Sequence, residues 1–222
     1  MKRTGCRAGT FSGKKGFGGA IFVYGSTGVS LSQVTVTNTS VVGYQGYGGA
    51  MVIYGCTSVS LVQVTVTKSS VVGIYGQGGA VVVISCSSVS LARVTVANSS
   101  VVGAYGTGGA VLVYSTTSVS VAQVTVTNSS VVGGYGKGGA VFVDSTTKIS
   151  LALVAIAGCS LVGEYGKGGA LYLARSTYVA LTAVTFTGNH AGRTGRGGAV
   201  YIDQVRYFRS PPVVTPPSRP SP

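Results

Sequence analysis

The sequence predicts an all-β fold: a parallel β-helix (solenoid) of about six coils, with three short strands in each coil. Three observations predict it. The tripeptide Gly-Gly-Ala begins at residues 18, 48, 78, 108, 138 and 168, always 30 residues apart, and a seventh copy begins at residue 197. Within each repeat, β-branched residues alternate with polar or small ones, which is the period of a strand. Ser, Thr, Asn and Gly, the residues of turns, separate these segments.

The repeat that ends at Lys148 shows where the strands are expected. Aliphatic residues recur two positions apart in every copy, as at Val141 and Val143, so this segment predicts a strand with one buried face. The three strands expected in this repeat are the segment with Val141 and Val143, residues 119–121, and residues 124–127. A further apolar pair, residues 131–132, leads into a Gly-rich loop, residues 133–139. A repeat of this length is too short for the four antiparallel strands of a propeller blade.

The repeats divide the chain into three parts. Residues 1–17 are predicted to be a partial coil or an amino-terminal cap, residues 18–203 the β-helix, and residues 204–222 a basic, Pro-rich disordered tail or linker. The first coil lacks its first half, which favours a fragment, and the basic start contains no apolar segment of a signal peptide. No apolar run reaches the length of a membrane-spanning helix, so no transmembrane segment is expected.

The formal net charge is +13, and basic residues gather at the two ends of the chain. A basic protein attracts anionic glycans, acidic lipid heads or nucleic acid. Alternatively, charges at both ends of a solenoid keep exposed sheet edges from pairing with other chains. Aromatic residues do not interleave with a basic stripe, so no specific nucleic-acid partner is expected. Anionic glycans or cell-surface components are the candidate partners, and the oligomeric state stays open.

Residues one repeat apart stack above one another in a β-helix, so each sequence column becomes a ladder. One column in the Gly-rich loops is a candidate sugar-binding platform or, alternatively, a set of loops packing on themselves: Tyr75, Tyr105, Tyr135 and Tyr165. Two outward columns resemble the Thr-x-Thr faces of insect antifreeze solenoids: Thr35, Thr37, Thr65, Thr67, Thr125, Thr127, Thr185 and Thr187. The expected spacing of these side chains is about 6.7 Å along a strand and about 4.8 Å between coils. Ala97, Ala155 and Ala157 interrupt these columns, and Thr is favoured in strands anyway.

Two further columns lie at bends. Asn38, Asn98 and Asn128 occupy a bend at which Asn tolerates left-handed backbone, and each also begins an Asn-x-Ser glycosylation sequon. Cys56 and Cys86 are 30 residues apart and hence adjacent in the stack. Their expected Cα distance of about 4.8 Å admits a disulfide in an oxidising compartment. No Cys or His spacing resembles a metal site, so neither metal nor cofactor is expected.

Carboxylates are too few for the chemistry of polysaccharide lyases and hydrolases, many of which are β-helices. The chain contains only Asp144, Glu164 and Asp203. Asp144 and Asp203 occupy the same position of the repeat and lie two coils apart, which corresponds to a distance of about 9.6 Å. That is the outer limit of the roughly 6.5–9.5 Å separation of an inverting pair. We therefore expect no enzymatic activity and predict no catalytic residue.

The last repeat carries a family resemblance. Residues 185–200 read TFTGNHAGRTGRGGAV, in which Phe-x-x-Asn is followed by Gly-Gly-Ala-Val. This resembles the paired FxxN and GGA-[ILV] repeats of the chlamydial-type polymorphic outer-membrane proteins; the GGA half matches all seven repeats and the FxxN half only this one. The resemblance implies a right-handed β-helix, surface display and adhesion, with no catalytic residues to carry over.

These observations lead to one expected function and two alternatives. We expect a non-catalytic, extracellular or cell-surface solenoid with a structural or adhesive role, which binds by a repetitive face, with glycans as candidate ligands. Ice binding by the Thr columns is the first alternative, and a polysaccharide-cleaving β-helix is the second.

Overall fold

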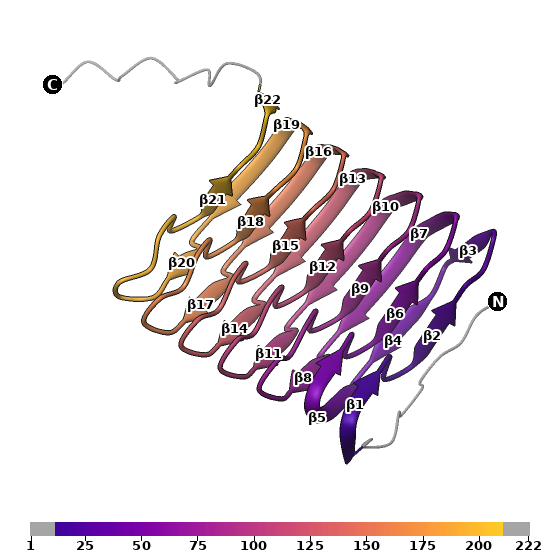
Figure 1. Cartoon of the computed structure of the whole chain (residues 1–222), viewed down its shortest axis with the longest axis horizontal. Helices are drawn as coiled ribbons and strands as arrows, with labels where there is room; N and C mark the ends of the chain where they lie inside the picture. The colour runs from indigo at the N-terminus through magenta and orange to yellow at the C-terminus, as the bar shows by residue number, and fades with distance from the viewer. Residues whose placement is uncertain (1–11, 211–222) are drawn as a thin grey trace, which may run out of the picture.

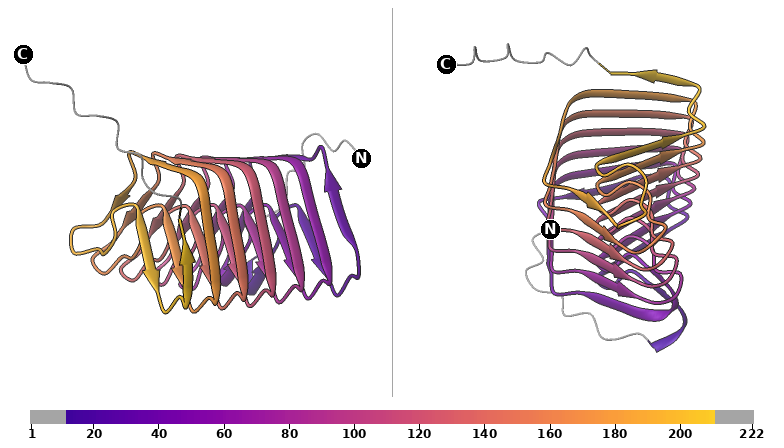
Figure 2. Two further views of the ribbon diagram at one scale, coloured as in Figure 1. Left: turned by 90° about the horizontal axis from the view of Figure 1, so that it is seen from above. Right: turned by 90° about the vertical axis from the view of Figure 1, so that its left-hand side faces the viewer.

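The computed structural model describes residues 12–210, which form strands, turns and bends. The strands stack into three parallel sheets that wind around one axis as a β-solenoid of about 6 turns (Figure 1). Figure 2 shows the same coils from two further sides, lying one after another along this axis. The predicted all-β parallel solenoid is confirmed. Between residues 12 and 210 there is no helix of the length and apolarity that crossing a bilayer requires.

Each coil contributes one strand to each sheet, except that the first coil contributes two, β3 and β4, to the third sheet. The first sheet contains β1 (Ser12–Phe17), β5 (Ser40–Tyr47), β8 (Ser70–Val72), β11 (Ser100–Val102), β14 (Ser130–Val132), β17 (Ser160–Val162) and β20 (His190–Ala191). The second contains β2 (Ile21–Tyr24), β6 (Met51–Tyr54), β9 (Val81–Ile84), β12 (Val111–Tyr114), β15 (Val141–Asp144), β18 (Leu171–Ala174) and β21 (Val200–Asp203). The third contains β3 (Val29–Ser32), β4 (Thr35–Thr37), β7 (Ser58–Thr67), β10 (Ser88–Ala97), β13 (Ser118–Thr127), β16 (Lys148–Ala157), β19 (Tyr178–Thr187) and β22 (Tyr207–Arg209).

The register between coils follows the sequence repeat. Val81 pairs with Val111, and Val111 pairs with Val141, so equivalent residues lie side by side in neighbouring coils. The last coil is one residue shorter, because Leu171 pairs with Val200. The side chains of one sequence column therefore stack along the axis, as predicted.

Three strands per coil are confirmed, but the segments that form them differ from the expectation. Residues 119–121 and 124–127 belong to one strand, β13 (Ser118–Thr127), and the apolar pair at residues 131–132 belongs to the third strand of the coil, β14. Gln123 between the two expected strands has a φ of 54°. One left-handed residue at this position bends the strand, while pairing continues in the same register on both sides.

The main core consists of stacked aliphatic side chains of the second and third sheets. The first sheet contributes a separate, completely buried column, against which glycines of the Gly-rich loops pack: Val41, Val71, Val101, Val131 and Leu161. Full burial of such a side chain contributes about 1.5–3 kcal/mol, but one coil leaves both of its edges in water. Stability therefore comes from stacking coil on coil.

The recurrence of Gly-Gly-Ala has a steric cause. A Cβ added at Gly109 would lie 2.1 Å from the carbonyl oxygen of Gly139 in the next coil. The preceding residue, Gly108, has a φ of 61°, and a Cβ there would lie 2.6 Å from the carbonyl oxygen of Val111. Ala110 is fully buried in the core. Only Gly fits the first two positions, and only a small residue fits the third.

The stacked strands extend past the range 18–203 that the repeats indicated. At one end β1 pairs with β5, so residues 12–17 already form part of a coil. At the other end β22 pairs with β19, and the ring of Tyr207 stacks on Tyr178 at 4.8 Å. The first residues of the expected tail therefore continue the third sheet. The Pro-rich part of that tail and residues 1–11 lie outside the described residues.

The predicted Asn bend is confirmed. Asn38, Asn98 and Asn128 have φ values of 52°, 54° and 48°, in the left-handed region. Their side chains are exposed, and the bend joins the third sheet to the first. Asn is one of the few residues other than Gly that adopts this conformation at low cost.

Candidate functional site

The predicted Tyr column forms an exposed ladder on the Gly-rich loops, which we call the Tyr ladder. Rings of Tyr75, Tyr105, Tyr135 and Tyr165 stack with centroids 5.1, 5.3 and 5.2 Å apart and planes within 14° of each other. Each inner ring turns its faces toward its neighbours and its edge and hydroxyl toward solvent. The loops thus pack on themselves, as one of the two alternatives predicted. A sugar-binding role of this ladder stays a prediction.

The predicted Thr columns lie on the outward face of the third sheet, which we call the Thr face. One column joins Thr35, Thr65, Thr95, Thr125, Ala155 and Thr185, and the other joins Thr37, Thr67, Ala97, Thr127, Ala157 and Thr187. Thr95, which the sequence analysis did not single out, extends the first column. All the Thr side chains are exposed or half-buried. Neighbouring outward positions hold mainly Ser and Ala, so the face is regular and nearly uncharged.

Cys56 and Cys86 are adjacent in the stack as predicted, and both are buried free thiols in this structure. Their disulfide in an oxidising compartment stays a prediction. In an in-register parallel stack the two Cβ atoms lie about 4.8 Å apart, beyond the roughly 3.5–4.5 Å that a disulfide requires. Each thiol instead donates to a carbonyl of its own coil: Cys56 to Tyr54 at 3.5 Å and Cys86 to Ile84 at 3.4 Å. Burial raises the pKa of the Cys86 thiol.

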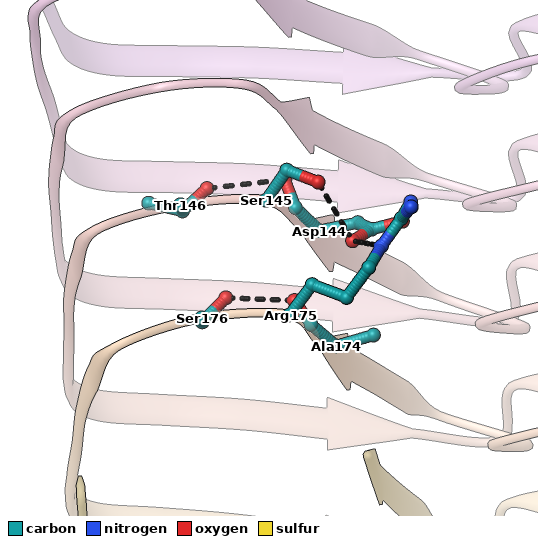
Figure 3. Close-up of polar contacts among 6 residues, drawn as sticks. All are labelled: Asp144, Ser145, Thr146, Ala174, Arg175 and Ser176. Carbon is teal, nitrogen blue, oxygen red and sulfur yellow. Dashed lines mark hydrogen bonds and ion pairs between the residues drawn. The ribbon is translucent and has the colours of Figure 1, made fainter. Parts of the chain in front are cut away.

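The cysteines occupy a column that otherwise holds hydroxyl residues. Ser26, Thr116, Thr146 and Ser176 stand at the same phase, and each donates to the carbonyl two residues earlier, at 3.3, 3.2, 3.3 and 2.8 Å. Figure 3 shows two of these bonds, from Thr146 and Ser176. A thiol replaces the hydroxyl as a weaker donor. The column therefore stabilises the bend after each strand of the second sheet, with or without sulfur.

Asp144 and Asp203 lie two coils apart with Ala174 between them. Both oxygens of Asp144 are engaged by Arg175: Nε donates to Oδ1 at 2.7 Å, and Nη2 donates to Oδ2 (Figure 3). Ser145 adds a hydrogen bond to Oδ1 at 3.1 Å. The hydrogen bond and the negative charge of Asp144 raise the pKa of the Arg175 guanidinium. This bidentate ion pair joins two neighbouring coils and engages both oxygens of the buried carboxylate.

A groove of about 670 Å³ runs along the outward face of the second sheet; we call it the aromatic groove. Its floor consists of outward side chains of β2, β6, β9, β12 and β15, and one rim consists of residues at the ends of the loops that follow the first sheet. Much of its lining is aromatic: Phe17, Phe22, Tyr24, Tyr47, Tyr54 and Tyr114. The sequence analysis did not identify this groove.

Four strands beneath the groove, β6, β9, β12 and β15, have buried residues on both faces, which corrects the single buried face expected for the segment of Val141 and Val143. The outward residues of β2 stay exposed. Val82 and Leu112 point away from the core, yet they are 0% and 1% exposed. The Gly-rich loop covers them, since a Cβ added at Gly78 would lie 2.3 Å from Cγ2 of Val82. Alternation predicts which side chains leave the core, but not what another segment then places over them.

The rim of the groove becomes basic along the axis. Tyr47, Gln77, Thr107, Lys137, Lys167 and Arg196 are joined by parallel bridges from coil to coil. Nζ of Lys137 lies 5.5 Å from the ring centroid of Tyr172, and Nζ of Lys167 lies 5.0 Å from that of Tyr201. Burial, together with the charges of Asp144 and Asp203, raises the pKa of Tyr172 to about 12. Aromatic rings and cations thus continue beyond the groove.

The column at residues 24, 54 and 114, Tyr in each case, was the available signal for this groove. It differs from the Tyr ladder because Ile84 interrupts it and because it lies on a strand rather than a loop. In the part of the chain that the structure describes, no three His, Cys, Asp or Glu side chains gather where they could hold a metal ion.

The chain was also compared with known proteins, since the repeats resemble those of the polymorphic outer-membrane proteins. No family model, no curated protein and no solved structure matches it. The chain is a parallel β-solenoid with an exposed Tyr ladder, an open Thr face and an aromatic groove.

Proposed function

We propose that this chain is a non-catalytic β-solenoid that acts outside the cell or at its surface as a rigid structural and adhesive rod. The observation that carries the proposal is the in-register stacking of nearly identical coils from β1 to β22. Every outward feature is thereby presented repeatedly, at intervals of about 4.8 Å. Such a surface gains affinity from many equivalent weak contacts with a repetitive polymer. Glycans are repetitive polymers of this kind.

Two sequence features support a surface location. The segment SPPVVTPPSRPSP at residues 210–222 has the composition of an extended spacer that holds a domain away from a surface. The GGA and FxxN motifs resemble those of surface-displayed passenger regions. The ion pair of Asp144 with Arg175 supports the absence of catalysis, because it engages the carboxylate that hydrolysis would require.

Binding to immobilised cell-wall polysaccharides, measured at low and high salt, tests the proposal. We expect binding that weakens as salt rises, because the excess of basic residues supplies a screened attraction. The same polysaccharides should release no reducing sugar. Turnover that disappears in Asp144→Asn would overturn the non-catalytic assignment, and an absence of binding to every polysaccharide would overturn the adhesive one.

The Thr face favours a second candidate function, ice binding. Its columns are straight, in register and open to solvent, and the face carries mainly Ser, Thr and Ala. Thermal hysteresis of the purified protein measures this activity directly. A Thr95→Lys, Thr125→Lys double variant should abolish it, while Tyr105→Ala on the opposite loops should leave it unchanged. Absence of hysteresis in the unaltered protein would exclude this function.

A further inference from the structure

We infer that the aromatic groove binds one extended acidic polysaccharide, a chain of sugar rings that bear carboxylates. The inference rests on the proposed function and identifies the surface and the class of ligand. It concerns the groove over the second sheet, not the Tyr ladder or the Thr face. The groove has a volume of about 670 Å³.

The shape of the groove suits an extended chain. Residues from the first to the fifth coil line it, and one column supplies a residue in each of the first four coils: Tyr24, Tyr54, Ile84 and Tyr114. Four steps of about 4.8 Å give a length of roughly 19 Å along the axis. A ligand parallel to the axis therefore meets an apolar or aromatic side chain of this column at each of these four coils.

The groove contains an aromatic ring that stacks on no other ring of the described residues, whereas every ring of the Tyr ladder stacks on a neighbour. Tyr54 stacks on Tyr24 at 5.5 Å on one side, whereas Ile84 stands in the column on its other side. Tyr114 stacks on no other aromatic ring within residues 12–210. Both rings are 38% exposed. The apolar C–H face of a sugar ring packs on such a ring, and its hydroxyls reach the polar groups beside it.

Polar groups for those hydroxyls lie on the rim. The side-chain amide of Gln77 makes no hydrogen bond to another part of the described chain, and Oγ1 of Thr107 is buried there without a partner. A mostly apolar groove with a few convergent polar groups is the usual form of a ligand site. The phenol hydroxyls of Tyr54 and Tyr114 add donors and acceptors on the floor.

The charges around the groove favour an acidic chain over a neutral one. Lys15 lines one end of the groove, and Lys137 and Lys167 continue the rim beyond the other. Of the carboxylates near this face, Asp144 is neutralised by Arg175, while Asp203 lies two coils farther along. The cations thus exceed the unpaired anions along the path of the ligand, which is the complementarity that carboxylates need.

Titration of the full chain with hexagalacturonate and with neutral cellohexaose tests the inference. Calorimetry gives the Kd, and the variants below assign the binding to the groove or to the Tyr ladder. The double variant Tyr54→Ala, Tyr114→Ala should raise the Kd for hexagalacturonate about tenfold or more. The matched control Tyr105→Ala, Tyr135→Ala in the Tyr ladder should change it less than about twofold. Circular dichroism verifies that both variants fold.

A second pair of variants tests the charge. Lys137→Gln with Lys167→Gln should weaken hexagalacturonate binding and flatten its salt dependence, whereas Lys68→Gln with Lys148→Gln, away from the groove, should not.

Equal affinity for cellohexaose and hexagalacturonate would overturn the acidic class of ligand. Loss of binding in the Tyr ladder variant but not in the groove variant would overturn the groove and leave the proposed function standing. No binding of either oligosaccharide, with polysaccharide binding retained, would overturn the inference alone; loss of both would overturn the proposed function too.

Discussion

The second and third sheets have the same alternation and the same repeat, yet their outward faces differ. On the third sheet Thr125 points outward and is exposed. On the second sheet Leu112 also points outward, and it is 1% exposed. The outward column of the second sheet is accordingly apolar, with Val52, Val82, Leu112, Phe142 and Tyr172, whereas that of the third is mainly Thr.

The connections between strands explain this difference. One left-handed residue, such as Asn128, joins the third sheet to the first, and too little chain is present there to cover the Thr face. A Gly-rich loop joins the first sheet to the second, and its glycines pack on the outward side chains of the second sheet. The length of a connection therefore decides whether an outward face stays open or becomes a second core beside a groove.

The largest expected effect tests the register on which both faces depend. Deletion of residues 89–118 joins Ser88 to Val119, and because Ser88 pairs with Ser118 every column stays in phase. This variant should fold into a solenoid one coil shorter, whereas deletion of residues 89–103 should unfold the chain. Circular dichroism and thermal melting measure the outcome. Similar behaviour of the two deletions would contradict the stacking argument.

The next effect concerns the loop that covers the second sheet. Gly109→Ala places a Cβ 2.1 Å from the carbonyl oxygen of Gly139, and we expect a loss of about 4 kcal/mol or more in the free energy of unfolding. Gly134→Ala in an equivalent loop is the control, because nothing lies within 4 Å of its Cβ position. Denaturant titration compares the two. Equal stabilities would show that the coils can separate without cost.

A pair of outward substitutions compares the two faces directly. Leu112→Ala should lower the free energy of unfolding by about 3 kcal/mol, since it leaves a cavity under the loop. Thr125→Ala on the open face should change it by less than about 0.5 kcal/mol. The same denaturant titration measures both. A similar cost at the two positions would mean that the Thr face is covered in solution.

The smallest effect is a dependence on alkaline pH. The pKa of Tyr172 is raised to about 12, first by burial, so the folded state holds this proton more tightly than the unfolded chain does. Its contribution to stability is complete below the unfolded pKa of about 10 and is lost as pH rises toward 12. Tyr172→Phe should therefore lose less stability than the unaltered protein between pH 9.5 and 11.5, as measured by denaturant midpoints. An identical loss of stability in the variant and the unaltered protein would show that Tyr172 does not cause the pH dependence.

Most of the architecture could be predicted from the sequence, because a fixed repeat converts sequence columns into spatial ladders. The Tyr ladder, the Thr columns and the left-handed Asn bend all lie where the period places them. The adjacency of Cys56 and Cys86 was predicted correctly as well, whereas the period alone does not decide whether the two thiols form a bond. Bonding depends on the direction of each side chain, and stacked side chains point the same way instead of toward each other.

The sequence by itself determined the repeat, the register and the two sides of every strand, since these follow from local periodicity and from steric needs such as that of Gly109. Only the tertiary structure decided that the pairing continues across Gln123, that a loop buries the outward face of the second sheet, and that this loop leaves the aromatic groove beside Tyr54 and Tyr114. Those features depend on contacts between segments of different coils and sheets. Local periodicity contains no information about which segment covers which face.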